Sequence, residues 1–472
     1  MYRIVSTLLT IFAVASGREG GYGESETRWV SHADFPLHKL SIKNPKDVKL
    51  DTVKQYSGYL DIDNNNHMFY WAFESRSDPK KDPTIVWMNG GPGCSSLQAI
   101  LFENGPAFLD NDMTPVRNPY SWNNKANIIF LDQPIGVGFS EGSEVVSTTP
   151  QAGHDFNAFL TLFFKQFPHW FREDNFHIAG ESYGGRYIPT FAEGLMANSN
   201  RAINVTSVMI GNGLVDPVAQ YAAYQPMLCG EGGVPQKISS SDCASMKSSL
   251  PRCLSTLQSC LNGRSSRSYT CTNAESRCAS QEYPWAKLNP YDIRDAVCAP
   301  AQDGLCYPGL DDVQHFFNQD SVKAAIGADR DINYLTCDNK VNARFSNNHD
   351  SFTRTQSNVT SLLEQGVKVL VYSGDKDIIC NWLGGRQWTS QLDWQMKDQF
   401  SDAISNMKDW KVDGKAAGQV ANAGPLTFLR VYDAGHMVPH DQPETSYAMI
   451  QAWLEKDVGF QQDYNLKDKQ LK

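Results

Sequence analysis

Several common functional patterns are missing from this sequence of 472 residues. It has no dense run of lysine and arginine, and its formal net charge is −10, so nothing in it favours binding to nucleic acid. It contains neither the zinc-binding pattern H-E-x-x-H nor the phosphate-binding pattern G-x-x-x-x-G-K-S/T. We therefore expect no metal, no cofactor and no nucleic-acid partner.

Long apolar runs are also rare. Beyond the first residues no run is long enough to span a bilayer, and the polar C-terminus lacks the hydrophobic tail of a GPI anchor. At the start, Arg3 precedes a short apolar run that ends in small residues. This layout predicts a secretory signal peptide over residues 1–17, with a buried N-terminal helix as the structural alternative. We expect secretion to the extracellular medium, in preference to a vacuolar or lysosome-like compartment, and no membrane anchor.

The cysteines and sequons fit an exported chain. An odd total of 11 cysteines implies disulfide bonds and one leftover thiol. Eight of them crowd between Cys229 and Cys306, which marks a distinct subdomain. Two N-x-T sequons, at Asn204 and Asn358, are compatible with glycosylation after export.

Short apolar runs recur along the chain with helix-like segments between them. Residues 56–62 and 67–73 flank an Asp/Asn-rich turn and predict a β-hairpin. Further runs, each typical of a buried strand, cover Thr84–Met88, Asn127–Leu131, Phe176–Ala179, Ser207–Ile210, Lys368–Tyr372 and Leu426–Val431. Continuous apolar strands that alternate with helices predict an α/β fold with a mostly parallel sheet and helices on both faces.

One of these helices is well marked. Thr149 is a candidate cap, Pro150 suits the first turn, and an apolar stripe follows at Phe156, Phe159, Leu160 and Phe163. We expect this stripe to pack in the core.

Changes in composition along the chain indicate how it is divided into domains. Residues 18–54 are polar and predict an N-terminal arm or a propeptide, and the core begins with residues 55–215. The alternation of strands and helices then stops over residues 216–333, where cysteines and serines accumulate. We interpret this segment as a disulfide-rich cap inserted into the core, which resumes over residues 334–472.

The segment from Gly180 to Gly184 is the clearest functional pattern. This G-x-S-x-G follows an apolar run and precedes a helix-like segment, as in a nucleophile elbow that exposes Ser182. Asp377 and His436 each follow one of the later strands, and parallel sheets place their sites at such strand ends. The order Ser, Asp, His is that of α/β-hydrolases. We therefore expect Ser182 as nucleophile, His436 as general base, and Asp377 orienting the imidazole.

A glycine-rich loop follows the strand Thr84–Met88, where α/β-hydrolases donate a backbone N–H to the oxyanion. With this loop and the elbow together, the chain resembles the serine carboxypeptidases of the carboxypeptidase Y type, and among them the secreted fungal carboxypeptidases of the S1 kind. The resemblance covers roughly residues 50–458 and rests on four blocks in order. These are Asn89-Gly90-Gly91-Pro92-Gly93-Cys94-Ser95-Ser96, Asp132-Gln133-Pro134 through Gly138-Phe139-Ser140, Gly180-Glu181-Ser182-Tyr183-Gly184 and Gly435-His436-Met437-Val438-Pro439.

The resemblance implies roles that the residues alone do not reveal. It implies the same triad, and it assigns the oxyanion-hole N–H groups to Gly91 and Tyr183. It also implies that the substrate's terminal carboxylate is bound by a further set, namely Asn89, Glu103 and Glu181, with Trp87 in support.

The resemblance further implies a disulfide pattern. The eight clustered cysteines alone allow 105 connectivities. By similarity, the expected pairs are Cys94–Cys337, Cys229–Cys243, Cys253–Cys278, Cys260–Cys271 and Cys298–Cys306. Cys380 is left as the free thiol beside Asp377.

The leading hypothesis is an exopeptidase that releases C-terminal residues from peptides and proteins, working best at acidic pH and needing no obligate partner. An acyltransferase or esterase is the alternative, because it would use the same triad. A non-catalytic binding protein should lack part of the triad or oxyanion hole, and no part is missing. The absence of a zinc-ligand pattern disfavours a metallocarboxypeptidase.

Overall fold

The computed structural model describes residues 27–45, 48–63, 65–197, 203–263, 267–285, 288–295, 305–455, 460 and 463–467. The predicted signal peptide, residues 1–17, lies outside these ranges. Among the helices in these ranges, none combines the length and the apolar character needed to cross a membrane.

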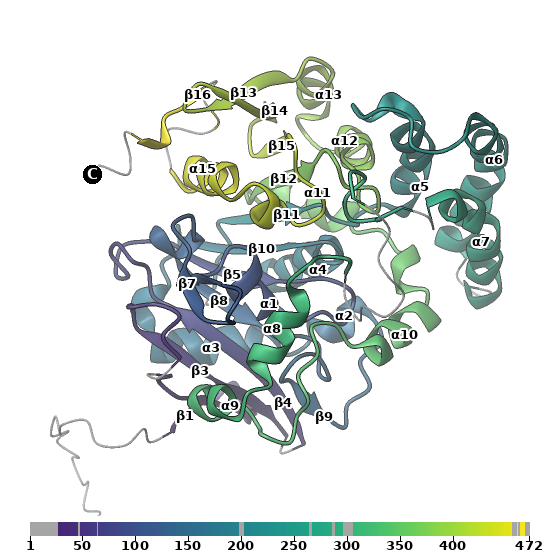
Figure 1. The fold of residues 1–472 in the computed structure, drawn as a ribbon. Helices are drawn as coiled ribbons and strands as arrows, with labels where there is room; N and C mark the ends of the chain where they lie inside the picture. Colours follow the sequence, from purple (N-terminus) through teal and green to yellow (C-terminus); the bar gives the residue numbers. More distant parts are fainter. Residues whose placement is uncertain are drawn as a thin grey trace, which may run out of the picture.

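Within the described residues, fourteen strands form one large sheet, and its middle is parallel. The parallel strands, in spatial order, are β8 (Asn127–Leu131), β5 (Thr84–Met88), β10 (Phe176–Glu181), β11 (Ser207–Gly211), β12 (Lys368–Gly374) and β15 (Leu426–Val431). All six were expected from their apolar runs. The fold is therefore the α/β fold that the sequence predicts, with its parallel strands at the centre (Figure 1).

The flanks of the sheet are antiparallel, so the whole sheet is mixed around the parallel centre that the sequence predicts. On one side lie β1 (Arg28–His32), β2 (Phe35–Ile42), β3 (Gln55–Ile62), β4 (Asn66–Phe73) and β9 (Glu141–Gly142). On the other side lie β14 (Lys415–Ala423) and β13 (Lys408–Val412), with the short β16 (Asp463–Tyr464) parallel to β13. The β3–β4 pair is the predicted hairpin. A separate small sheet pairs β6 (Ala107–Leu109) with β7 (Pro115–Arg117).

The first two strands lie within residues 18–54, where the sequence predicts an N-terminal arm or a propeptide. β2 pairs with β3 and so extends the main sheet. Leu40 and Ile42 of this strand are buried, although the surrounding sequence is polar. Too few apolar residues alternate here for the pattern to reveal a half-buried strand.

Side chains of the central strands alternate between two apolar layers, as the pleat requires. On β5, Val86 and Met88 enter one layer, and Ile85 and Trp87 enter the other. The first layer is covered by α3 (Phe156–Gln166), α4 (Gly184–Met196), α11 (Gln356–Glu364) and α12 (Trp382–Ser390). The second is covered by α1 (Gln98–Phe102), α8 (Leu310–Phe317), α9 (Asp320–Ile326) and α15 (Pro443–Leu454).

The predicted helix near Thr149 is interrupted. The structure has a short α2 (Thr149–Ala152) followed by α3, and the N-cap position is Thr148. Thr149 lies inside α2 and its hydroxyl donates a 2.6 Å hydrogen bond to Asp350 Oδ2 instead of capping the helix. The expected stripe of Phe156, Phe159, Leu160 and Phe163 is buried, as predicted.

The cap is smaller than the predicted range of 216–333. Its lobe contains α5 (Pro217–Pro226), α6 (Ser240–Asn262) and α7 (Arg267–Glu282), at one side of the core (Figure 1). α8 and α9 belong to the core, because Phe317 packs against Trp71 and Phe139. The remaining helices are α10 (Asn339–Asn347), α13 (Lys397–Ser405) and α14 (Val438–Asp441).

Disulfides stabilise the cap and one loop of the core. The structure contains the expected bonds Cys229–Cys243, Cys253–Cys278, Cys260–Cys271 and Cys94–Cys337. The fifth expected pair includes Cys298, which lies outside the described residues. Within the described part of the chain, Cys380 is the free cysteine, and it is buried.

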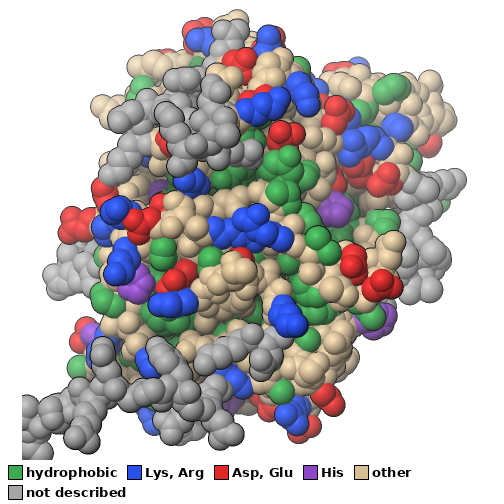
Figure 2. Space-filling model, turned by 60° about the vertical axis from the view of Figure 1, so that its left-hand side comes forward, with side chains coloured by type: hydrophobic (Ala, Val, Ile, Leu, Met, Phe, Trp, Pro, Cys, Tyr) green, Lys and Arg blue, Asp and Glu red, His purple; other side chains and the backbone are tan. Residues whose placement is uncertain are grey.

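The surface of the core is mixed in charge. On the described part of the face drawn in Figure 2, acidic and basic side chains are interspersed. This face therefore presents no patch of a single sign.

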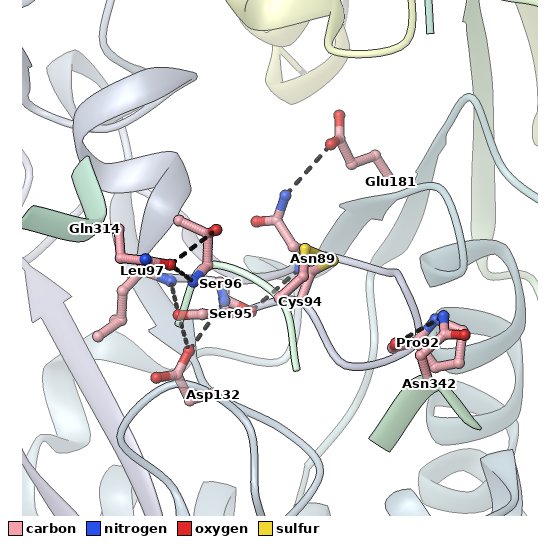
Figure 3. Close-up of a disulfide and its surroundings, with 12 residues drawn as sticks. Asn89, Pro92, Cys94, Ser95, Ser96, Leu97, Asp132, Glu181, Gln314 and Asn342 are labelled. Carbon is pink, nitrogen blue, oxygen red and sulfur yellow. Dashed lines mark hydrogen bonds between the residues drawn. A yellow bond between two sulfur atoms is a disulfide. The ribbon is translucent and has the colours of Figure 1, made fainter. Parts of the chain in front are cut away.

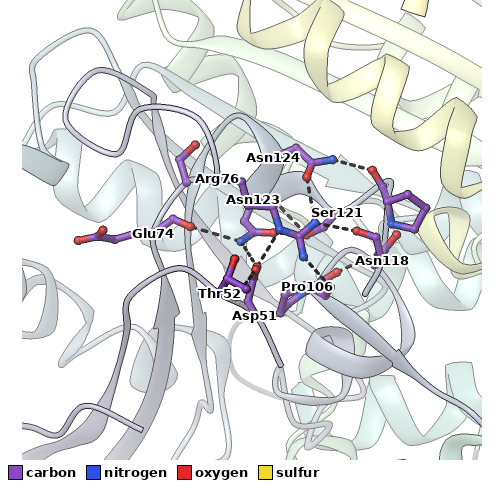
Figure 4. A network of polar contacts seen from close by, with 12 residues as sticks. Asp51, Thr52, Glu74, Arg76, Pro106, Asn118, Ser121, Asn123 and Asn124 are labelled. Carbon is purple, nitrogen blue, oxygen red and sulfur yellow. Dashed lines mark hydrogen bonds and ion pairs between the residues drawn. The ribbon is translucent and has the colours of Figure 1, made fainter. Parts of the chain in front are cut away.

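A buried arginine joins the segment before β3 to the loop that follows α1. Arg76 Nε donates to Asp51 Oδ2 at 2.8 Å, and their side chains are 7% and 1% exposed (Figure 4). The guanidinium also donates to three oxygens of the loop, namely Pro106 O, Asn118 O and Asn124 Oδ1. Removing the arginine would therefore take a hydrogen-bond donor away from each of these acceptors.

We expect Arg76→Leu to lower the free energy of unfolding by about 3 kcal/mol, because it leaves the Asp51 carboxylate buried without its cation. Urea unfolding with the disulfides intact measures this change. Lys81→Ala is the matched control, since Lys81 is 83% exposed in its pair with Asp78. Its effect should be far smaller than that of Arg76→Leu, because water and salt screen an exposed pair. Equal effects of the two substitutions would contradict the assignment.

Candidate active site

Ser182 occupies a sharp turn between β10 and α4. Its φ of 61° lies in the left-handed region, which is strained for a side chain other than glycine. Three backbone hydrogen bonds hold the turn: Ser182 N donates to Gly211 O, and Ser182 O accepts from Gly185 N and Leu214 N, each at 3.0 Å. A Cβ on Gly185 would lie 2.6 Å from Leu214 N, so only glycine allows this approach. The serine is thus held at the carboxyl end of β10, partly exposed, as the elbow pattern predicts.

Asp377 and His436 meet at the same edge of the sheet. They follow β12 and β15, and His436 Nδ1 lies 2.8 Å from Asp377 Oδ2, with both side chains at most 1% exposed. The carboxylate can only accept, so Nδ1 carries the proton. Nε2 is then the nitrogen that can take a proton from a nucleophile.

Asn212 was missed by the sequence analysis. It follows β11, the strand between β10 and β12, and its Nδ2 donates to Asp377 Oδ2 at 2.7 Å. Its own Oδ1 accepts from Gly374 N at 3.1 Å, which fixes the amide. The position directly after an apolar strand was the available signal, because the carboxyl ends of parallel strands share one edge.

The glycine-rich loop after β5 lies directly against the elbow. A Cβ on Gly90 would fall 2.3 Å from Tyr183 N and 2.8 Å from Ser182 Cβ, so the contact depends on glycine. Gly91 has a φ of +103°, and it lines one cavity together with Ser182 and Tyr183. The two backbones expected to form the oxyanion hole are therefore brought together beside the serine.

Asp132 anchors this loop from below (Figure 3). Its Oδ1 accepts from Ser95 Oγ at 2.6 Å and from Ser96 N at 3.0 Å, and its Oδ2 accepts from Phe139 N at 3.0 Å. Burial raises the pKa of Asp132 to about 7. The Cys94–Cys337 disulfide holds the preceding residue of the loop. The loop is thus attached at adjacent positions to two other parts of the chain.

The residues expected to bind a carboxylate form one buried cluster. Asn89 Nδ2 donates to Glu103 Oε1 at 2.8 Å and to Glu181 Oε1 at 3.3 Å, and the three side chains are at most 2% exposed. Trp87 Nε1 donates to Asn89 Oδ1 at 2.7 Å, which orients the amide so that its NH₂ faces the glutamates. Figure 3 shows Asn89 directed at Glu181.

The two glutamates do not behave as ordinary carboxylates. Burial raises the pKa of both groups, and the nearby charge of Glu103 raises the pKa of Glu181 further. Glu103 Oε2 and Glu181 Oε2 have no hydrogen-bond partner among the described residues. The pair therefore keeps a proton to higher pH than isolated carboxyl groups do, and a protonated glutamate can donate an O–H to a further acceptor.

Asp377, Cys380 and His436 place one ligand atom each within 4.8 Å of one another, so we asked whether they could hold a metal. His436 Nδ1 is already engaged with Asp377. Burial, followed by the charge of Asp377, raises the pKa of the Cys380 thiol well above its usual value. A metal needs the thiolate. The arrangement suits proton transfer better than metal binding.

The predicted glycosylation sites lie away from this edge. Asn204 is partly exposed just before β11, where its Nδ2 donates to Glu173 O at 3.1 Å, and Asn358 is partly exposed in α11. Glycosylation of either residue stays a prediction.

Comparisons with known proteins agree with this geometry. A family model described as serine carboxypeptidase matches residues 45–456. Carboxypeptidase Y of Candida albicans is 49% identical over 436 residues, which is 91% of this chain and 79% of that protein. A vacuolar serine-type carboxypeptidase of Saccharomyces cerevisiae is 46% identical over 433 residues, 90% of this chain and 84% of the other. The crystal structure of a prohormone-processing carboxypeptidase from Saccharomyces cerevisiae aligns with a TM-score of 0.73 and 26% identity, covering 87% of this chain and 92% of its own.

We expect thiol titration of the denatured, unreduced protein to find one free thiol per chain, and peptide mapping to place the label on Cys380. This follows from the four disulfides and from the predicted Cys298–Cys306 bond. In the native protein the same thiol should react slowly, because it is buried and its raised pKa keeps it protonated. Three labelled cysteines would disprove the fifth bond, and label on Cys94 would disprove the pairing.

Proposed function

The chain belongs to the serine carboxypeptidase family, and from this premise we propose how its residues release C-terminal amino acids from peptides. The observation that carries the proposal is the buried cluster of Asn89, Glu103 and Glu181. Glu181 directly precedes Ser182 in the chain, and Asn89 directly precedes Gly90, which lies against Ser182. Such a cluster suits a substrate with a free carboxylate. A serine that merely hydrolysed esters would have no use for it.

In the proposed reaction, Ser182 Oγ attacks the carbonyl carbon of the last peptide bond while His436 Nε2 takes the hydroxyl proton. Asp377, held by Asn212, keeps the imidazole oriented and stabilises its cation. The proton then passes to the leaving amine, and the C-terminal amino acid departs. Water, activated by the same imidazole, hydrolyses the acyl-enzyme. The N–H groups of Gly91 and Tyr183 would stabilise the oxyanion during both acylation and deacylation.

The terminal carboxylate of the substrate would accept hydrogen bonds from Asn89 Nδ2 and from the proton of the glutamate pair. Three ionised carboxylates cannot share a dry site, because each disfavours the ionisation of the others. Binding should therefore be strong while the pair keeps its proton and weak once the pair is fully ionised. This dependence supports an exopeptidase that works best at acidic pH.

The alternative activity is that of an acyltransferase or esterase, because the triad would accept an ester or pass the acyl group to an alcohol. The carboxylate-binding cluster favours peptide hydrolysis. For the location, the disulfides and the predicted signal peptide support passage through the secretory pathway. The name of the vacuolar relative supports an acidic vacuole as a destination beside the extracellular medium expected from the sequence.

We expect the purified protein to shorten a peptide from its free C-terminus, giving a ladder of masses, while the same peptide with a C-terminal amide is cleaved far more slowly at acidic pH. Ser182→Ala should be folded and should lose activity by several orders of magnitude, because the nucleophilic route is gone. Mass spectrometry of the two peptides after digestion, by the wild-type protein and by the variant, measures these outcomes. Cleavage inside the peptide, or near-normal turnover by the variant, would refute the proposal.

We expect the peptide KM to rise with pH as the glutamate pair loses its proton, because the ionised pair repels the substrate carboxylate. Below the raised pKa the proton is present and binding is strong, while His436 must be neutral to act as base. An ester with a blocked C-terminus lacks the third carboxylate, so its rate should persist to higher pH. In the double variant Glu103→Gln/Glu181→Gln, the alkaline limb of the pH profile for peptide cleavage should move to higher pH. The pH profile for the ester should not change.

The control for this experiment is Glu364→Gln, which removes one exposed carboxylate at the end of α11 and should leave both profiles unchanged. Profiles of KM and kcat against pH for both substrates provide the measurement. An unaltered peptide profile in the double variant would show that the pair does not govern binding.

A further inference from the structure

A cavity opens beside Ser182. Its volume is about 320 Å³, which lies at the lower end of the range for small-molecule pockets. Ser182 lines it, whereas Asn89, Glu103 and Glu181 are not part of its described lining. The remaining lining residues are Gly91, Tyr183, Leu214, Pro217, Tyr221, Tyr224, Glu282, Ser351, Phe352, Ile379 and Cys380.

The position of this cavity determines which part of a peptide can enter it. With the terminal carboxylate bound at Asn89 and the attacked carbonyl at Ser182, the last residue of the substrate spans the distance between the cluster and the serine. The residue that contributes the attacked carbonyl becomes the acyl part of the acyl-enzyme. Its side chain is therefore the one that enters the cavity.

Glu282 is the group that distinguishes this cavity from an ordinary apolar one. It is the last residue of α7, in the cap, and one of its carboxylate oxygens accepts a hydrogen bond from the hydroxyl of Tyr221 on α5. The other described lining residues are apolar or carry hydroxyl or thiol groups, so Glu282 supplies the carboxylate there. Burial raises the pKa of Glu282, and the described lining of the cavity contains no lysine, arginine or histidine to pair with it.

We propose that Glu282 selects substrates with lysine or arginine immediately before the bond that is cleaved. The cation of such a side chain would supply a positive charge opposite the Glu282 carboxylate. The aliphatic stem would pack on Leu214 and Phe352. Tyr221 positions the carboxylate at the cap end of the cavity. This inference deepens the proposed carboxypeptidase function and rests on it only for the orientation of the peptide.

The test uses two esters that differ only in the acyl residue. One carries Nα-blocked lysine and the other Nα-blocked norleucine, which has an aliphatic side chain without the ammonium group. Both have the same alcohol as leaving group, so the carboxylate-binding cluster is not involved. The measured quantity is the ratio of kcat/KM for lysine to kcat/KM for norleucine, followed from acidic to neutral pH.

The expected ratio is above one for the wild-type protein and about tenfold lower for Glu282→Gln, which is a difference of about 1.4 kcal/mol. Glu231→Gln is the matched control, because Glu231 lies between α5 and α6 in the cap, is exposed, and is not in the described lining of the cavity. It removes the same charge from the cap and should leave the ratio unchanged. Active-site titration of each variant with a serine-reactive phosphonate establishes that the compared proteins are folded.

An equal ratio in wild type and Glu282→Gln would overturn the inference, since a carboxylate that only ties α7 to Tyr221 would not discriminate between the esters. An equal fall in both variants would also overturn it, because the effect would then come from the overall charge of the cap. Failure of the exopeptidase proposal looks different. In that case a blocked peptide with a free C-terminus is not shortened, while the ester ratio still responds to Glu282.

Discussion

The site depends on one constraint: two carboxyl groups, Glu103 and Glu181, are buried side by side with a single amide between them. Two charges in such a place would be costly, so a proton stays on the pair. In the proposed reaction, that proton makes the acidic cluster a hydrogen-bond donor for the carboxylate of the substrate. Such a site would bind a free C-terminus without any arginine or lysine in the cluster.

The surrounding structure serves to hold this arrangement in place. Trp87 orients the amide of Asn89, and Asp132 together with the Cys94–Cys337 disulfide fixes the loop that follows. On the other side, the strained turn at Ser182 is maintained by hydrogen bonds to the end of β11 and the residues after it. Both supports begin at the carboxyl edge of the parallel strands. The sheet is therefore what brings together residues that are far apart in sequence.

Much of this could be predicted from the sequence, and the misses have a common cause. The six central strands, the elbow and the positions of Asp377 and His436 follow from local patterns, namely apolar runs and what comes directly after them. The role of Glu103 was predicted only from the resemblance to a known family, because nothing in the local sequence shows that a glutamate after a short helix will be buried. Asn212 and Glu282 matter through contacts across the fold. The first two strands were missed because their burial comes from pairing with β3 and not from their own apolar content.

The central claim, that a shared proton binds the substrate carboxylate, can be measured directly by calorimetry on Ser182→Ala. A peptide with a free C-terminus and its amide are each titrated into the protein in buffers of different ionisation enthalpy, which gives the number of protons taken up on binding. The account predicts uptake near zero at acidic pH, where the pair is already protonated. As pH rises through the raised pKa, uptake should approach about one proton per chain for the free peptide and stay near zero for the amide. Binding of the free peptide without proton uptake at any pH would contradict the account.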